Sequence, residues 1–540
     1  MTLYVPEAFA DDEADILRRY FTNLDGPVFA LVNLPEVVKG ALFARYSRSP
    51  KSLRRLFLDE FVGELDMSGD HTVDATIGLE RAEQLYERVF FEYGDDSVAQ
   101  LGGVHLACEQ ASNLLTKVLE WGRLMSYLEQ STRYIAYDGR LGGRYRYYRD
   151  GTILASRFGT RYVGDMDRMF DAYSEVIDAV TEHVRTTVPR GSSDSEFVYR
   201  QATRAKALDA ARGMLPAASL SNVGIYGSGQ GFESLLLRMR THPLPEARDY
   251  AELMLYELRK VIPSFLRRVD LPERGGAWSD YFADTRARTQ AIVDRLFGDE
   301  RPATTDEVTL VDWDPEAEDK LLAAVCYPHS RLPEDQLLAR VRMLGTDDRI
   351  ALLKAYVGDR TNRRHKPGRA FERSGYRFDI LSDYGAFRDL QRHRMLTIDW
   401  QPLTPRHGYS RPALIDETGV ADSFDGALAR SAELYDLLAG DFPEQARYAV
   451  SMAYRLRYTM QFNAREAIHM LELRSSPQGH PAYRRLALEM HRLIAERAGH
   501  RVIAEVMTHL TVAAPELERL ESERRAEARR QPPMAPTPAP

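Results

Sequence analysis

The chain has 540 residues, which is enough for roughly two to four domains with a large buried core. Its 44% hydrophobic and 28% charged residues are typical of a globular protein, and its net charge of −8 argues against a general nucleic-acid binder. No apolar run approaches the roughly 18 residues of a membrane-spanning helix, and the acidic N-terminus lacks the apolar core of a signal peptide. We therefore expect a cytoplasmic protein with no nucleic-acid and no membrane partner.

The cysteine content indicates neither a disulfide framework nor thiol chemistry. Cys108 and Cys326 are far apart in the sequence, each among apolar neighbours, which favours buried free thiols in a reducing compartment. The chain has no His-Glu-x-x-His, Cys-x-x-Cys or Gly-x-Ser-x-Gly pattern. We therefore predict no metal site, and no motif supports serine esterase chemistry.

The first elements of the chain recur in its second half. An apolar segment at 27–32 precedes a helical pattern, and a second apolar segment at 308–312 precedes another. The stretch at 267–305 is polar and turn-rich, with one helical pattern around 286–296. We interpret this stretch as the connection between two copies of one unit.

Two pairs of arginines support the duplication. Arg212 and Arg240 are 28 residues apart, and Arg447 and Arg474 are 27 residues apart, within similar local sequences. Matches in the same order in both halves indicate a tandem repeat. We therefore divide the chain into a first copy, a connection, a second copy and a disordered Pro-rich tail, at residues 1–270, 271–305, 306–525 and 526–540.

Two segments of the first copy have the composition of binding sites. Ser131 and Arg133 would point the same way in an extended or turning backbone, which suits a monophosphate; the alternative is a polar helix end. The segment at 140–149 interleaves arginine with tyrosine, a pattern that also occurs in RNA-binding proteins. The glycine-rich segment at 227–231 lacks the Lys-Ser/Thr of a phosphate loop, so we interpret it as a turn before a helix.

The second copy contains the clearest strand pattern. Between Tyr448 and Phe462, large apolar residues alternate with small or polar ones, as in a strand with one buried face. A shorter alternation at 376–380 repeats the pattern. Long helical patterns alternate with these strands, without the Gly-rich turns of βαβ units. We therefore predict an α+β fold with a mixed sheet and long helices.

Arg392, His393 and Arg394 follow a helical pattern that starts at Tyr384. At a helix end, three consecutive side chains spread around about half of the circumference, which suits a bulky polyanion better than a core. The alternative is a solvated last turn, where cations interact favourably with the helix dipole.

Asn463, Arg465 and Glu466 open a helix directly after the long strand. Asn463 at the N-cap and Glu466 three residues later form a capping-box pattern, which is a purely structural interpretation. In the alternative, Arg465 and the free backbone N–H groups at the start of the helix bind a phosphate or pyrophosphate.

Together, these motifs resemble the flavin-dependent thymidylate synthases, the ThyX family. The family signature is Arg-His-Arg, seven residues and then Ser, usually continued as Ser-x-Arg-Tyr. The second copy keeps the triplet at 392–394 but has Pro402 at the serine position. The first copy has Trp-Gly-Arg at 121–123 and keeps Ser-Thr-Arg-Tyr at 131–134, and the segment at 94–98 resembles the family's Gly-His-x-Ser/Thr with its histidine lost. The signature is thus divided between two ThyX-like copies.

The resemblance implies a role for each matching residue. It implies that FAD is held by Arg392, His393, Arg394, Asn463 and Arg465. It implies that the dUMP phosphate is held by Ser131, Arg133, Arg447 and Arg212. It places the uracil ring against Arg474, with Met239-Arg240 as the counterpart in the first copy, so that Arg474 is the catalytic residue and Arg240 is a substrate-binding residue.

The resemblance also implies a reaction. Family members methylate C5 of dUMP with methylenetetrahydrofolate and take hydride from reduced FAD, with NADPH as the reductant. They are homotetramers with shared sites, so a double-length chain implies a homodimer that imitates the tetramer. Two alternatives remain: a ThyX-derived flavin- or nucleotide-binding protein without turnover, and a flavin-dependent C5 modification of another uridine nucleotide. RNA binding through 140–149 is a third.

The divided signature predicts the number of flavins. The first-copy counterparts of the FAD-binding groups are Trp121, Gly122, Gly229 and Gly231, which carry no charge. We therefore expect at most one flavin per chain.

Overall fold

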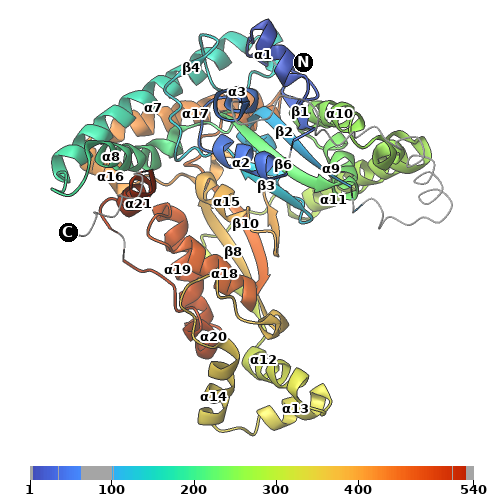
Figure 1. Cartoon of the computed structure of the whole chain (residues 1–540), viewed down its shortest axis with the longest axis vertical. Coiled ribbons are helices and arrows are strands. Elements are labelled where there is room, and N and C mark those ends of the chain that lie inside the picture. The colour runs from blue at the N-terminus through green and yellow to red at the C-terminus, as the bar shows by residue number, and fades with distance from the viewer. Residues whose placement is uncertain (1–3, 35, 63–99, 101, 514, 531–540) are drawn as a thin grey trace, which may run out of the picture. The chain divides into compact units, whose positions relative to one another are not determined.

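The computed structural model describes residues 4–34, 36–62, 100, 102–513 and 515–530 (Figure 1). The chain divides into two compact units, each assembled from three segments. Unit 1 comprises Met1–Ser174, Met214–Pro302 and Asp425–Ser451, and unit 2 comprises Glu175–Gly213, Ala303–Phe424 and Met452–Pro540. Each unit thus includes a short segment from the other half of the chain. The predicted motif at 94–98 and residues 531–540 of the predicted tail lie outside the described residues.

Unit 1 is built on a four-stranded antiparallel sheet in the order β1-β2-β6-β3 (Figure 1). Its strands are β1 (Val28–Leu31), β2 (Gly103–Ser112), β3 (Met125–Glu129) and β6 (Leu220–Ser228). A separate hairpin consists of β4 (Arg140–Leu141) and β5 (Arg144–Tyr145). Its helices include α1 (Asp11–Leu17), α2 (Glu36–Tyr46), α3 (Leu53–Glu60), α5 (Asn113–Leu119), α6 (Gly151–Ala155), α9 (Gly229–Arg240), α10 (Pro245–Arg259) and α11 (Ala277–Phe297).

Unit 2 repeats this sheet, in the order β7-β8-β10-β9. Its strands are β7 (Val308–Trp313), β8 (Gly375–Asp383), β9 (Leu396–Trp400) and β10 (Arg455–Asn463). Its helices include α8 (Glu196–Ala211), α12 (Ala317–Cys326), α13 (Glu334–Val341), α14 (Thr346–Val357), α15 (Tyr384–Leu390), α16 (Ala413–Thr418), α18 (Ala464–Arg474), α19 (Pro481–Glu496), α20 (Arg501–Glu505) and α21 (Leu520–Arg530). Two long helices, α7 (Gly159–Thr187) and α17 (Ala421–Ala439), each contain residues of both units. The matching strand orders confirm an α+β fold with a duplicated unit.

The strand register assigns equivalent residues in the two copies. Ser112 pairs with Leu220 at one end of the first sheet, and Asp383 pairs with Arg455 at the same end of the second. The offset is therefore 271 residues for the strands before each crossover (383 against 112) and 235 for those after it (455 against 220). With these offsets, β3 coincides with β9 and β6 with β10 over their full lengths. Residues at the sites of the two copies can then be compared one by one.

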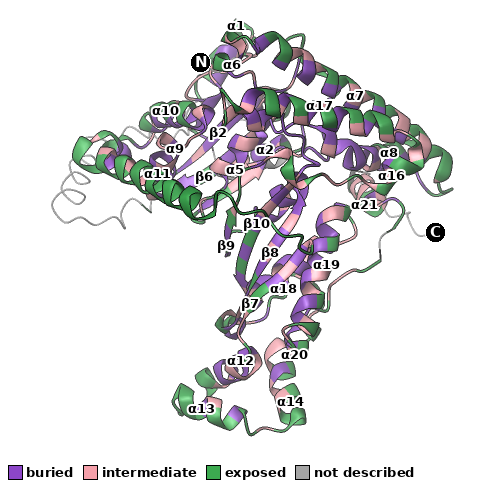
Figure 2. Cartoon of the chain, turned by 180° about the vertical axis from the view of Figure 1, so that it is seen from behind, coloured by how far each residue is buried: buried purple, intermediate pink, exposed green. Residues whose placement is uncertain are grey.

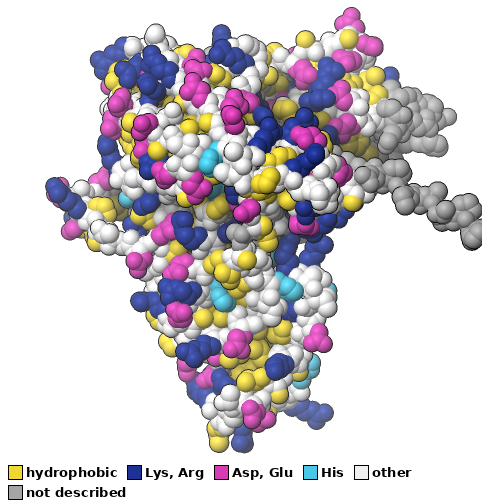
Figure 3. Space-filling model, turned by 90° about the vertical axis from the view of Figure 1, so that its left-hand side faces the viewer, with side chains coloured by type: hydrophobic (Ala, Val, Ile, Leu, Met, Phe, Trp, Pro, Cys, Tyr) yellow, Lys and Arg dark blue, Asp and Glu magenta, His cyan; other side chains and the backbone are white. Residues whose placement is uncertain are grey.

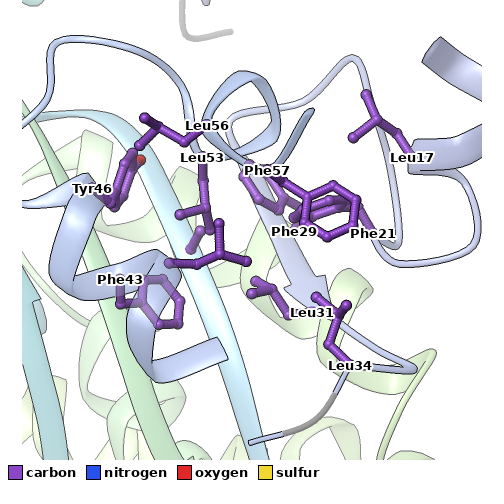
Figure 4. Packing of buried hydrophobic residues seen from close by; sticks show 12 residues of the cluster. Leu17, Phe21, Phe29, Leu31, Leu34, Phe43, Tyr46, Leu53, Leu56 and Phe57 are labelled. Carbon is purple, nitrogen blue, oxygen red and sulfur yellow. The ribbon is translucent and has the colours of Figure 1, made fainter. Parts of the chain in front are cut away.

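A core of aromatic and aliphatic side chains covers β1 in unit 1 (Figure 4). All four residues of β1 are buried, so this strand has core on both faces. Phe21 packs edge-on against Phe29 and Phe57, with ring centroids 5.6 and 5.4 Å apart. Such edge-to-face pairs stabilise the fold beyond the area that they bury.

A buried ion pair lies beside this core. The Arg54 side chain is fully buried over the Phe29 ring, and its Nη2 donates to Glu109 Oε2 at 3.2 Å. Glu109 also accepts from the Tyr46 hydroxyl and the Leu53 backbone N–H, at 3.1 and 3.0 Å. Because burial removes both charges from water, each depends on the other and on these hydrogen bonds.

We expect Arg54→Met to lower the free energy of unfolding by about 3–5 kcal/mol, because it leaves the buried Glu109 carboxylate without its cation. Urea denaturation followed by fluorescence measures the change. The exposed pair between Arg18 and Asp15 provides the matched control, and Arg18→Met should cost less than about 1 kcal/mol. Equal effects of the two substitutions would show that burial does not set the strength of the pair between Arg54 and Glu109.

Two elements differ from the sequence-based expectation. The helix predicted around 286–296 starts at Ala277 and is exposed along its length (Figure 2). The additional turns at its start contain Trp278 and Phe282, whose rings stack one turn apart with centroids 6.0 Å from each other. The long strand starts at Arg455 rather than Tyr448, and Gln445–Ala449 form a 3-10 helix. Consecutive residues at 448–450 are all fully buried, so the alternation there does not mark a strand with one buried face.

The surface carries acidic and basic side chains interspersed over the face shown in Figure 3. Within the part of the chain that the structure describes, no helix combines the length and the apolar character that a membrane crossing requires.

Candidate functional site

A buried histidine connects two residues of α18 in unit 2. His393 lies in the turn after α15, and its Nε2 accepts a hydrogen bond from Arg474 Nε at 3.0 Å. Its Nδ1 lies 2.9 Å from Glu466 Oε1. Because a guanidinium N–H only donates, Nε2 must be unprotonated, so the proton of the neutral ring is on Nδ1 and donates to Glu466. The three residues thus form one hydrogen-bonded chain.

Burial controls the ionisation of this chain. Burial lowers the pKa of His393 well below its usual value, and the nearby cations Arg474 and Lys366 lower it further. Burial also raises the pKa of Glu466 and lowers that of Arg474. A neutral His393 is therefore the form that the site maintains at neutral pH.

The N-cap of α18 fixes the backbone of Glu466. The Asn463 side chain caps the helix by accepting from the Glu466 backbone N–H at 2.9 Å, as the capping interpretation predicts. The Glu466 carboxylate, however, accepts from His393 instead of closing a capping box. Arg465 points to other partners: its Nε donates to the Pro367 carbonyl at 2.9 Å and its Nη1 lies 3.1 Å from Glu372.

A cavity of about 540 Å³ lies elsewhere in unit 2, and the buried Arg212 is one of the residues that line it. Arg212 follows α8 and is only 3% exposed. Its Nη1 donates to Asp389 Oδ2 at 2.9 Å, and its Nη2 has no hydrogen-bond partner among the described residues. The cavity is lined by Arg212 together with residues that include Gly213, Asp383, Gly385, Arg411, Ala482 and Arg485.

Asp389 connects the cavity to the histidine chain. It forms the ion pair with Arg212, and its negative charge also raises the pKa of Arg474, opposing the effect of burial. The structure thus brings together three residues predicted from the sequence, Arg212, His393 and Arg474, in one part of unit 2. Neither Glu466 nor Asp389 was predicted to take part.

The predicted flavin-binding arginines lie on either side of the buried histidine. Arg392 and Arg394 are exposed, while His393 is 6% exposed. Two guanidiniums on one solvent-facing turn fit the pyrophosphate of FAD, which needs cations that it can reach. Arg465 is half-buried and already paired, and the Asn463 oxygen is used in the helix cap.

The remaining predicted substrate residues lie in unit 1. The Ser131 hydroxyl accepts from the Arg133 backbone N–H at 3.2 Å in the turn after β3, and Arg133 is 9% exposed. Arg447 pairs with Glu444 at 2.9 Å. Arg240 pairs with Glu252 and Asp270, at 2.7 and 3.0 Å. Their roles in binding a nucleotide stay predictions.

The strand register changes some of the first-copy counterparts that we assigned from sequence spacing. With the offset of 235, Arg474 corresponds to Met239 rather than Arg240, and Asn463 and Arg465 correspond to Ser228 and Gln230 rather than Gly229 and Gly231. With the offset of 271, His393 corresponds to Gly122, as predicted. Glu466 corresponds to Gly231. The first copy therefore has no member of the chain formed by Glu466, His393 and Arg474.

Unit 1 also differs where unit 2 has its cavity. The counterparts of Gly213 and Asp383 are Tyr448 and Ser112, and because α10 and α19 both begin with a proline, the counterpart of Ala482 is Glu246. Glu246 is fully buried and accepts from the Ser112 backbone N–H and the Tyr448 hydroxyl, both at 2.8 Å. Burial raises the pKa of Glu246 to about 7.

The tyrosines of the segment at 140–149 pack inside unit 1. Tyr145, Tyr147 and Tyr148 are buried. The guanidiniums of Arg140 and Arg149 lie 4.6 and 3.9 Å from the ring centroids of Tyr145 and Tyr147. Because bases would need these ring faces, the arginine-tyrosine pattern here serves packing by cation–π contacts.

The two cysteines do not form a nucleophilic site. Cys108 is buried, as predicted, and burial raises the pKa of its thiol. Cys326 is half-buried, contrary to the prediction, because it lies at the end of α12; burial raises the pKa of this thiol too. Neither thiol is activated as a thiolate nucleophile would need to be.

Comparison with known proteins assigns this chain to a family. The family model described as thymidylate synthase complementing protein matches residues 44–264 and 309–498, one match in each half of the chain. A UPF0159 protein of Chlamydia muridarum is 39% identical over 96% of this chain and 99% of its own length. A UPF0159 protein of Chlamydia pneumoniae is 39% identical over 91% and 93%, and one of Thermoplasma acidophilum is 30% identical over 90% and 97%. With both halves matched, this chain belongs to the thymidylate synthase complementing protein family.

Proposed function

We propose that this protein is a FAD-dependent thymidylate synthase that converts dUMP to dTMP. Methylenetetrahydrofolate supplies the methylene carbon and NADPH supplies the reducing equivalents. The observation that carries the proposal is the Arg474 guanidinium, held by a neutral histidine beside the ion pair of Asp389 and Arg212. Family membership supports the same reaction.

Arg474 has the properties that activation of a uracil ring requires. As C5 of uracil becomes a nucleophile, negative charge develops on the ring oxygens. A guanidinium held in place before the reaction stabilises that charge without reorganising, and one such donor is typically worth about 3–4 kcal/mol. The raised pKa values of both cysteine thiols argue against the alternative, in which a thiolate attacks C6.

Arg212 has the properties of a phosphate ligand. It is a buried cation with one guanidinium nitrogen unpaired within the described structure, and it faces a cavity of about 540 Å³. A nucleotide fits a cavity of this size. Arg411 and Arg485 also line the cavity, although each has an acidic partner, at 2.8 and 2.6 Å. We place the dUMP phosphate against Arg212 in the cavity of unit 2. The phosphate-binding roles of Ser131 and Arg133 stay predictions from the family resemblance.

FAD would be held by the exposed Arg392 and Arg394, with His393, Asn463 and Arg465 as the other family-derived candidates. When bound, the flavin supplies hydride for the reduction of the transferred methylene group. The protein's own contribution is to neutralise the pyrophosphate and to orient the uracil. We also propose that two chains form a homodimer, since the family resemblance implies sites shared between subunits.

Flavin should bind at no more than one equivalent per chain. The first-copy counterparts of Arg392, His393 and Arg465 are Trp121, Gly122 and Gln230, which supply no charge for a pyrophosphate. Absorbance of the flavin released from a known amount of protein measures the ratio. Arg394→Ala should empty the site, whereas Arg123→Ala at the equivalent first-copy position should leave it full. Two flavins per chain would contradict this assignment.

Arg474→Lys should lower turnover about 100-fold or more while the flavin stays bound, because an ammonium cannot keep both the bond to His393 and the planar donor edge. Tritium release from C5-labelled dUMP measures turnover. The control is Arg492→Lys on the exposed face of α19, where the arginine only pairs with neighbouring glutamates. Turnover of Arg474→Lys equal to that of the control would remove Arg474 from the mechanism.

Arg212→Met should weaken dUMP binding by about 1.5–3 kcal/mol, the usual contribution of a hydrogen bond to a charged group, without loss of flavin. Arg133→Ala should weaken binding to the same extent if that residue is also a phosphate ligand. Isothermal titration calorimetry measures the affinity, with the exposed Arg501→Met as the control. Unchanged affinity in Arg212→Met would mean that the cavity does not hold the nucleotide phosphate.

A further inference from the structure

We infer that Glu466 is a positioning residue of this reaction, which holds the Arg474 guanidinium in place through the neutral ring of His393. The inference rests on the proposed function, because it assigns Glu466 a part in the step that Arg474 carries. Within the described residues, the Glu466 carboxylate is hydrogen-bonded to His393 and not to Arg474, and Glu466 does not line the cavity. The hydrogen-bonded connection from Glu466 to Arg474 therefore passes through His393.

The spacing along α18 explains why a third residue is needed. Glu466 and Arg474 are eight residues apart, which is a rise of about 12 Å along the helix. The two side chains start more than two turns apart on the same helix, and within the described residues each is hydrogen-bonded to His393 and not to the other. The His393 ring enters from the turn after α15 and bridges this distance with bonds of 2.9 and 3.0 Å.

The Glu466 carboxylate selects the tautomer that Arg474 needs. A neutral imidazole carries one proton, and the carboxylate accepts it from Nδ1. If the proton moved to Nε2, that N–H would face the Arg474 Nε–H, and two donors would oppose each other. Glu466 and His393 are 7% and 6% exposed, so water contributes little to either bond. The position of the guanidinium therefore depends on the presence of the carboxylate.

The first copy provides independent support. It has glycine at both positions equivalent to His393 and Glu466, and Met239 in place of Arg474, so the three members are absent together. The equivalent helix α9 still has its N-cap, since the Ser228 hydroxyl accepts from the Gly231 N–H at 3.3 Å. The helix start therefore does not require a glutamate at this position. A role in the chain to Arg474 accounts for Glu466 better than capping does.

A metal site is the competing interpretation of the same residues. One ligand atom each of His393, Glu466 and His469 lie within 4.8 Å of one another, a set that divalent transition metals accept. A metal on His393 Nδ1, however, would force the ring proton to Nε2 and break the bond from Arg474. Burial lowers the pKa of His469, and the cations Lys366 and Arg363 lower it further, whereas the Glu466 charge acts in the opposite direction. The geometry therefore favours the hydrogen-bonded chain.

The kinetic test compares a variant that removes the acceptor for the His393 proton with one that keeps it. Glu466→Leu should lower kcat for tritium release about 100-fold, with the Michaelis constant for dUMP changed less than about threefold and flavin content retained. Glu466→Gln keeps an oxygen that accepts from Nδ1–H and should lose less than about tenfold. The exposed carboxylate variant Glu489→Gln on α19 is the control and should match the wild type. Equal kcat in Glu466→Leu and the wild type would overturn the proposal.

A double-mutant cycle decides the question if Glu466→Leu does not fold. Glu466→Gln and Arg474→Lys act on one chain of bonds, so the double variant should lose less than the product of the two single losses. Losses that multiply would show that the two residues act independently, and would overturn the positioning role.

The tautomer itself is a readout that needs no turnover. Two-bond ¹⁵N–¹H correlations on histidine-labelled protein, with His393 assigned from its absence in His393→Gln, should show a protonated Nδ1 and an unprotonated Nε2. Glu466→Leu should shift the ring toward Nε2–H. A wild-type ring protonated at Nε2 would overturn the inference. A wild-type protein with the expected tautomer that releases no tritium would instead end only the proposed function.

Zinc uptake separates the metal interpretation. Equilibrium dialysis against Zn²⁺ at about micromolar concentration should leave the wild type without stoichiometric metal, and His469→Ala should keep kcat within about twofold. One tightly bound Zn²⁺ per chain that is lost in His469→Ala would make the cluster a metal site and overturn the chain to Arg474.

Discussion

The geometry of the candidate site depends on a single proton, the one on Nδ1 of His393. A buried imidazole between a carboxylate and a guanidinium satisfies both neighbours in only one state, neutral and protonated at Nδ1. A second proton would place an N–H against the Arg474 N–H, and burial already lowers the pKa of the ring. The site thus avoids a third charge between Glu466 and Arg474, and the guanidinium keeps a fixed orientation at the partly exposed end of α18.

Duplication explains how such a site evolved without loss of the fold. Both copies keep the strand order and the ladder register, because a shift of one residue would turn every buried side chain of a strand to the other face. The chemistry at the ends of the strands is not constrained in this way. The first copy has glycine, glycine and methionine where the second has His393, Glu466 and Arg474. The second copy alone therefore carries the polar chain.

The sequence was sufficient for the α+β class and the duplication, because repeated landmarks report positions that the sheet register preserves. The equivalence of Arg212 and Arg447 agrees with the ladder offset, whereas the counterpart of Arg474 was assigned one residue too far along. Spacing alone could not show which position between the two arginines had shifted. The burial of His393 was also inaccessible, since exposed arginines stand on both sides. Glu466 was missed because a capping box already accounted for it.

The contrast between the two units at the cavity is a matter of side-chain volume. In unit 2, Gly213 and Ala482 line a cavity of about 540 Å³. In unit 1, the equivalent residues are Tyr448 and Glu246, which are buried and hydrogen-bonded to each other at 2.8 Å. A carboxylate and a phenol thus occupy the place that two small residues leave open. Glu246 of unit 1 thus stands at the position of Ala482, which in unit 2 lines the same cavity as Arg212. Unit 1 fills its own version of the site with side chains, and the proposed nucleotide cavity is present in unit 2.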